Sequence, residues 1–187
     1  MNLEPMSIDN FWRIIDGTTE GGPERKVQYD RLVGELSRLD DPTDILRFAI
    51  RFYPELRRSD TEEISAASDI MHGEVSDDLF TYFRLWIMSK GRRVYEAAIN
   101  DPDTLATLED DRTDQPTFWF ETFSYAESEA YKNVTGNDID YEQIFACTPK
   151  SPTPERPKRG EGIDRSDAGL KSRFPALWAK YKSWDVD

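Results

Sequence analysis

Helix-start signals recur along almost the whole chain, and they constrain the fold more than any other feature of the sequence. Ser7, Asp41 and Ser76 each precede an apolar stripe with three- and four-residue spacing, where an N-cap is expected. Pro23 and Pro42 stand where the first turn of a helix favours proline. Alternating strands joined by Asn-Gly or Asp-Gly turns are missing from the pattern. The sequence therefore predicts an all-α protein, a single irregular bundle of about seven to nine helices.

Punctuation residues also predict where individual helices end. Pro54 is expected to stop the helix that begins after Asp41, because proline lacks the N–H that the helix interior uses. The run 59–62, Ser-Asp-Thr-Glu, has the pattern of a capping box with Ser59 as its N-cap. Gly91 is predicted to mark a break or a close approach between two helices.

The aromatic residues indicate a real hydrophobic core in a rather polar chain. Hydrophobic residues make up 37% of the sequence and aromatic residues 12%. The aromatic runs at 11–12, 82–86 and 118–123 are interpreted as core segments. A chain of 187 residues is long enough for one compact domain of this kind.

Composition changes near residue 148 and divides the chain into three parts. Residues 1–147 carry the helical pattern, and residues 148–168 are rich in proline and glycine and are interpreted as an extended linker. Residues 169–187 hold apolar side chains at helical spacing, from Phe174 to Tyr181. We expect this segment to form a C-terminal amphipathic helix that docks back on the body.

Charge is strongly acidic and unevenly distributed. The chain has 24 basic and 37 acidic side chains, a net charge of −13, which disfavours nucleic acid as a partner. Residues 151–187 carry 8 basic and 6 acidic side chains, so residues 1–150 carry 16 − 31 = −15. Residues 101–142 alone hold 12 acidic and 2 basic side chains. The acidic surface is either a solubility feature or the binding face for something cationic: a basic protein, a metal or the chain's own tail.

The remaining chemistry-bearing residues are sparse. Cys147 has no second cysteine with which to form a disulfide, and His72 is the lone histidine. No nucleotide-binding glycine loop, hydrolase elbow or metal-ligand spacing is present, so neither a cofactor nor a metal is expected. The N-terminal sequence does not resemble a signal peptide, and no stretch has the roughly 20 apolar residues that cross a membrane. These features predict a cytoplasmic protein with no membrane contact.

Several motifs together resemble the bacterial domain-of-unknown-function family 4240. The matching positions are Phe11-Trp12, Gly73, Ser76-Asp77-Asp78 with Phe80, Tyr82-Phe83-Arg84 with Trp86-Ile87, Gly91, and Asp101-Pro102-Asp103 with Leu105. The resemblance covers roughly residues 8–146. The family often has Gly-Gly-Cys before the Ser-Asp-Asp motif, whereas this chain has His72-Gly73-Glu74-Val75, so a role for a thiol does not carry over. The resemblance implies a discrete domain but no activity.

The densest polar group in the sequence surrounds the start of one predicted helix. It consists of His72, Asp77, Asp78, Arg84 and Trp86. Asp77 and Arg84 are seven residues apart, so they share a helix face, and together they form a possible rim for an anion or a proton-transfer site. The alternative is structural, with the aspartates stabilising the helix N-terminus, Arg84 in a salt bridge and His72 ending a helix.

A second candidate pair is Glu121 with Tyr125, which lie four residues apart on the late aromatic helix. If this face met Asp77, paired carboxylates would be available for acid–base chemistry.

The sequence leads to two hypotheses about function. The first is a small acidic binding or regulatory module that recognises a basic protein partner. The second is an enzyme or small-ligand binder with a polar cleft formed by Asp77, Arg84 and Glu121.

Overall fold

The computed structural model describes residues 3–22, 24–108, 118–147 and 162–182 and confirms the all-α prediction. Within these ranges the chain forms helices and connecting segments, without strands. The elements are α1 (Ile8–Thr18), α2 (Arg25–Ser37), α3 (Pro42–Arg58), α4 (Glu62–His72), α5 (Asp77–Ser89), α6 (Arg92–Asn100), the 3₁₀ helices η1 (Pro102–Thr107) and η2 (Glu121–Tyr125), α7 (Ala126–Thr135), α8 (Tyr141–Cys147), α9 (Asp167–Arg173) and α10 (Pro175–Tyr181). Pro23, the polar stretch 109–116 and most of the expected linker lie outside the described residues.

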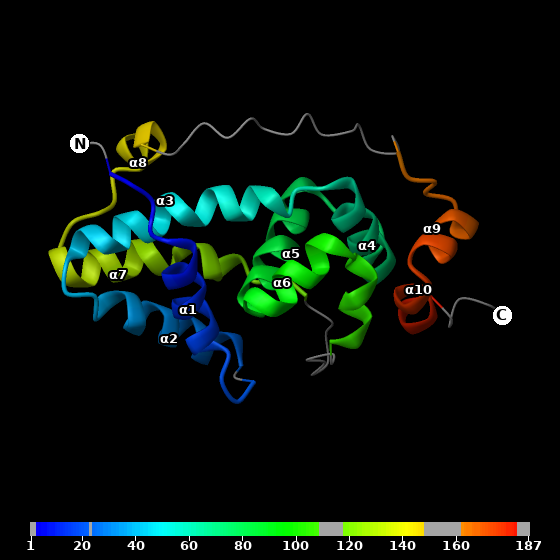
Figure 1. Cartoon of the computed structure of the whole chain (residues 1–187), viewed down its shortest axis with the longest axis horizontal. Coiled ribbons are helices and arrows are strands. Elements are labelled where there is room, and N and C mark those ends of the chain that lie inside the picture. Colours follow the sequence, from blue (N-terminus) through cyan, green and yellow to red (C-terminus); the bar gives the residue numbers. More distant parts are fainter. Residues whose placement is uncertain (1–2, 23, 109–117, 148–161, 183–187) are drawn as a thin grey trace.

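The long helix α3 spans the two halves of the molecule. In one half α7 packs against both α2 and α3, with α1 crossing beside α2 (Figure 1). In the other half α4 and α6 pack against η1, and α5 packs against α4 and α6. The helix α10 lies against α4 and η1 at the far end (Figure 1). The 3₁₀ helix η2 contacts both α5 and α7, so it joins the halves.

Short polar side chains begin the helices much as the sequence predicts. The hydroxyl of Ser7 accepts a hydrogen bond from the amide of Asn10, and that of Ser76 accepts one from Leu79. The carboxylate of Asp41 accepts from the amide of Thr43. These contacts satisfy amides that the first helical turn leaves without partners.

Two predicted boundaries around α3 and α4 are wrong. The helix α3 continues through Pro54 to Arg58, because the turn after the proline is stabilised by the burial of Leu56 and of the paired Glu55. The N-cap of α4 is Thr61, which accepts from the amide of Ile64, and Ser59 instead donates to the carbonyl of Leu56. The run 59–62 therefore contains two possible N-caps, Ser59 and Thr61. Because α3 extends to Arg58, Ser59 ends that helix and Thr61 begins α4.

Most aromatic residues of the predicted core segments are buried, whereas Tyr82 and Trp119 are partly exposed. Phe11, Trp12, Phe83, Trp86 and Phe123 are each at most 1% exposed, and they belong to one hydrophobic cluster that extends through the described molecule. Contacts between rings connect α1 with α3 and α3 with η2. Aromatic side chains of α1, α3, α5 and η2 therefore form a large part of the core.

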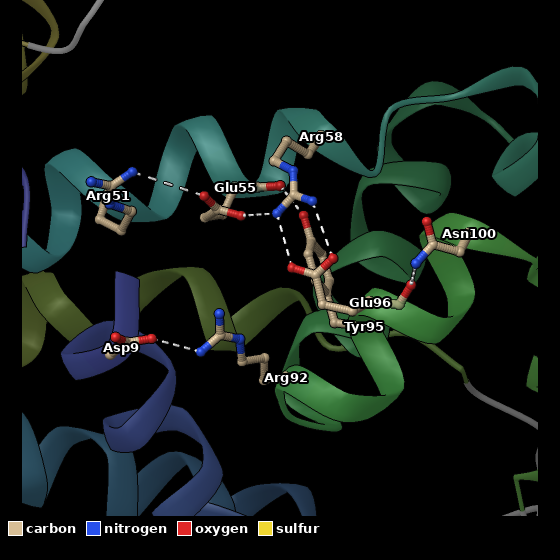
Figure 2. A network of polar contacts seen from close by, with 8 residues as sticks. All are labelled: Asp9, Arg51, Glu55, Arg58, Arg92, Tyr95, Glu96 and Asn100. Atoms are coloured by element: carbon tan, nitrogen blue, oxygen red, sulfur yellow. Dashed lines mark hydrogen bonds and ion pairs between the residues drawn. The ribbon is translucent and has the colours of Figure 1, made fainter. Parts of the chain in front are cut away.

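A polar network ties α3 to α6 at the edge of this core (Figure 2). The carboxylate of Glu55 is 2.7 Å from Arg58, and Arg58 donates two 3.1 Å hydrogen bonds to the carboxylate of Glu96. The hydroxyl of Tyr95 donates to the Glu55 carbonyl. Because Glu55 is only 5% exposed, its charge is stabilised by these arginine contacts.

The C-terminal segment docks on the body, but as two helices and not as one. It begins at Asp167, and the proline at position 175 starts a new helix directly after Phe174. Leu170, Phe174 and Leu177 are buried in the main cluster. The contacts of this tail with α4 and η1 are intramolecular, so the tail completes the core of its own chain.

Charged side chains also hold the tail in place. Arg165 pairs with both Glu62 and Asp69 on α4, and Arg173 pairs with Glu63. The carboxylate of Asp103 accepts hydrogen bonds from the amides at the start of α10. The basic tail therefore covers part of the acidic body.

Candidate functional site

The two aspartates predicted as site residues lie at the start of α5. Asp77 and Asp78 are exposed in the first helical turn, directly after the N-cap Ser76. Negative charge there interacts favourably with the helix dipole. Their position fits the structural alternative from the sequence.

Arg84 lies inside the protein, at 8% exposure. Its guanidinium is 3.4 Å from the Asp60 carboxylate, donates to the Leu56 carbonyl and donates at 3.0 Å to the Thr81 hydroxyl. It also lies over the Phe80 ring. Arg84 therefore links α5 to the end of α3 and to the loop before α4.

His72 and Trp86 belong to an aromatic cluster. Trp86 is 1% exposed and stacks on Phe83, and the His72 ring contacts Phe83, Phe118 and Trp119. Burial lowers the pKa of His72 to about 4, so the imidazole is neutral at physiological pH. Trp86 is therefore a core residue, and the half-buried His72 packs at the edge of the same cluster.

Glu121 and Tyr125, in contrast, stand at the edge of a groove. The Tyr125 hydroxyl donates a 2.7 Å hydrogen bond to the Glu121 carboxylate, so the two residues of the predicted pair are in direct contact. Tyr125 is 50% exposed, an unusual exposure for a large aromatic side chain. Of the predicted site residues, this pair is the one that the structure brings together at a cavity.

The groove has a volume of about 850 Å³ and lies where α2, α3, α5, η2 and α7 meet. Five tyrosines line it: Tyr29, Tyr53, Tyr82, Tyr125 and Tyr141. The other lining residues are Leu56, Thr81, Leu85, Ser124, Ser128, Glu129, Lys132 and Asp138. Arg84 contacts this wall through Thr81, whereas Asp77, Asp78 and Trp86 do not line the groove.

Carboxylates accompany the tyrosines around this groove. The Tyr29 hydroxyl donates at 2.5 Å to Glu129. Burial and then Glu121 raise the pKa of Tyr82, and the hydrogen bond to Glu121 raises the pKa of Tyr125. Among the lining residues that the structure describes, Lys132 is the one cation, and its ammonium is 2.9 Å from Asp138. The groove therefore combines aromatic faces with excess negative charge.

Glu127 lies fully buried behind the tyrosines. Its Oε1 atom accepts a 3.2 Å hydrogen bond from the Tyr53 hydroxyl. Burial raises the pKa of Glu127 to about 7, against the opposing effect of hydrogen bonds from Tyr53 and Tyr141. A carboxyl group that titrates near neutrality thus supports the groove from the interior.

Sequence patterns missed most of this groove. Tyr29 and Tyr53 lie on apolar stripes of α2 and α3, where helical spacing does not distinguish a core residue from a groove residue. Glu127 lies two residues from Tyr125, and nothing in its spacing signals burial. The one useful signal was the local Glu121–Tyr125 pair.

Two further findings concern other kinds of site. In the described ranges, no helix has the length and apolar character needed to cross a bilayer. No cluster of three or more His, Cys, Asp or Glu side chains suited to a metal ion occurs among the described residues.

Comparison with known proteins yields one match. No curated protein and no solved structure matches the chain. The model of one family, described as "Protein of unknown function (DUF4240)", matches residues 6–133. That range includes α1 to α6, both 3₁₀ helices and most of α7, and therefore most of the groove. The chain belongs to this family of proteins of unknown function.

Proposed function

We propose that the protein is a small acidic binding or regulatory module, and that its tyrosine groove recognises a basic segment of a partner protein. The observation that carries this proposal is the lining of the groove, five tyrosines accompanied by Glu121, Glu129 and Asp138. Tyrosine faces attract cations, and the carboxylates add charge complementarity.

Long-range electrostatics supports the same partner class. Residues 1–150 carry a net charge of −15, so the body attracts a basic protein and repels polyanions. The tail offers an internal example, because Arg165 and Arg173 bind carboxylates of α4. The exposed groove carboxylates Glu129 and Asp138 are not among those that pair with Arg165 and Arg173.

The second hypothesis, an enzyme or small-ligand binder, has less support. Its proposed cleft requires Asp77, Arg84 and Glu121 to converge. Arg84 is engaged with Asp60 and Thr81, and Asp77 is exposed at the start of α5. Glu121 is the member that adjoins the groove, so a ligand there would meet the tyrosines rather than Arg84.

We also propose a cytoplasmic location. The single cysteine supports it, because a protein of a reducing compartment does not depend on disulfides.

Peptide titration tests the binding proposal. A short peptide rich in lysine and arginine, and a copy with glutamate at those positions, are titrated against the full chain at low and high salt by calorimetry. We expect the basic peptide to bind and the acidic copy not to bind. High salt should weaken binding, because it screens exposed charges.

Two groove variants locate the binding. Tyr125→Ala removes an exposed ring, and Glu129→Gln removes a charge; each should weaken the basic peptide roughly tenfold. Glu35→Gln is the matched control, because Glu35 is an exposed, ion-paired carboxylate of α2 that does not line this groove. Equal binding of both peptides, or an equal loss in the Glu35→Gln control, would overturn the proposal.

A further inference from the structure

Three tyrosine hydroxyl protons around the groove are already engaged within the protein. Tyr29 donates to Glu129, Tyr125 to Glu121 and Tyr53 to Glu127, at 2.5, 2.7 and 3.2 Å. A hydroxyl has a single proton, so Tyr29 and Tyr125 can offer an incoming ligand their ring faces and oxygen lone pairs.

The smaller hydroxyl groups of the lining behave in the same way. Ser124 donates at 2.8 Å to the carbonyl of Glu121, and Thr81 donates at 3.0 Å to the carbonyl of Asp77. The Lys132 ammonium, which has donors, is paired with Asp138. Apart from the two further N–H groups of Lys132, these engaged donors leave a surface that mainly accepts hydrogen bonds.

Unused acceptors are abundant in the same lining. Glu129 and Asp138 are exposed, and the hydrogen bonds just described use Oε2 of Glu129 and Oδ1 of Asp138. A carboxylate has about four lone-pair sites on its two oxygens, so each retains capacity for further donors. Ring faces attract any cation, but the carboxylate oxygens bind more strongly to a cation whose N–H groups can donate hydrogen bonds.

We infer that the groove selects a lysine or arginine side chain whose N–H donors are intact, and that it discriminates against the fully methylated ammonium. This inference rests on the proposed function and specifies the ligand of the same site. Aromatic cages that bind methylated lysine rely on ring faces and charge alone. Here the acceptor-rich rim makes donors an added requirement, so lysine methylation in a partner would weaken its binding.

A set of matched peptides separates charge from hydrogen-bond donation. One position of the basic peptide carries lysine, arginine, trimethyllysine or citrulline, and the rest of the sequence is kept constant. Trimethyllysine keeps the charge without donors, and citrulline keeps donors without the charge. We expect lysine and arginine to bind, and each of the other two to bind about tenfold more weakly or worse, because a hydrogen bond to a charged group is lost or weakened.

The outcomes distinguish this inference from the proposed function. Trimethyllysine binding as tightly as lysine, with both above the acidic copy, would overturn the inference and leave basic-partner recognition intact. If no cationic peptide binds, both fail. The difference between the lysine and arginine arms shows which donor geometry the groove prefers.

A variant tests whether the rim is responsible. Glu129→Gln replaces a charged acceptor with an amide that has its own donors, so the lysine-to-trimethyllysine affinity ratio should fall several-fold. Glu35→Gln should leave that ratio unchanged. A ratio that stays at the wild-type value in Glu129→Gln would contradict the assignment, and circular dichroism verifies that both variants are folded.

Discussion

Glu127 is the buried side chain whose ionisation most directly affects the groove. Its pKa of about 7 in the folded protein exceeds its ordinary value of 4.5. Between these values the folded protein holds a proton that the unfolded chain releases. The free energy of unfolding therefore falls as pH rises through this window, by about 3 kcal/mol from this group. Urea denaturation at several pH values should show this fall, and Glu127→Gln should remove it.

The ionisation of His72 has the opposite effect on how the free energy of unfolding depends on pH. Burial lowers its pKa from 6.5 to about 4, so the unfolded chain binds a proton that the folded protein excludes. Stability is therefore lost as pH falls from about 6.5 to about 4, again by about 3 kcal/mol. The same denaturation series on His72→Asn should lack this loss. If the acid side of the profile is the same in the variant and the wild type, His72 is not buried in its neutral form.

At the scale of elements, Gly91 determines how α5 turns into α6. Its φ is +88°, and a Cβ added there would lie 2.5 Å from Oδ1 of Asp16, the atom that accepts from the Arg92 amide. Gly91→Ala should therefore cost roughly 1–3 kcal/mol of unfolding free energy.

Gly34 provides the matched control, since it lies inside α2 and an added Cβ would meet Arg38 at an ordinary 3.6 Å. Gly34→Ala should stabilise the protein by about 0.5–1 kcal/mol. Thermal denaturation of the two variants compares them directly. Similar shifts in both would show that the close approach at Gly91 is not important.

The tail helix α10 depends on a cap supplied from elsewhere in the chain. Asp103 accepts from the amides of Ala176 and Leu177. Asp103→Ala should cost about 1 kcal/mol, and the loss should be concentrated in α10 as faster amide hydrogen exchange. Asp30→Ala breaks an exposed pair with Lys26 and should leave α10 exchange unchanged. Slow exchange of α10 in Asp103→Ala would show that its buried side chains are sufficient to hold it.

At the scale of the whole molecule, acidic side chains occur at two different sites with different partners. At one, carboxylates of α4 and η1 hold the basic tail, so part of the excess charge is compensated internally. At the other, carboxylates accompany the tyrosines of the groove, where Lys132, the one basic residue of the described lining, is already paired with Asp138. The sequence left open whether the acidic surface serves solubility or binds a cation such as the chain's own tail, and the arginines of the tail do pair with carboxylates of α4.

The sequence alone determined the helical class and most helix starts. Caps such as Ser7, Asp41 and Ser76 act through contacts within three residues, and the Glu121–Tyr125 pair spans a single helical turn. Interactions this local can be predicted from spacing. The aromatic core was also predictable, because apolar runs with helical period have few other uses.

Tertiary structure decided the rest, because the energies involved come from residues far apart in the chain. α3 passes Pro54 since burial of Leu56 and the pairs of Glu55 outweigh a lost backbone hydrogen bond. The groove collects tyrosines from positions 29 to 141, and Glu127 is buried only because α3 and α8 close over it. The residue spacing within one helix contains no information on where the other helices will pack. The helices were therefore predictable from the sequence, and the site was not.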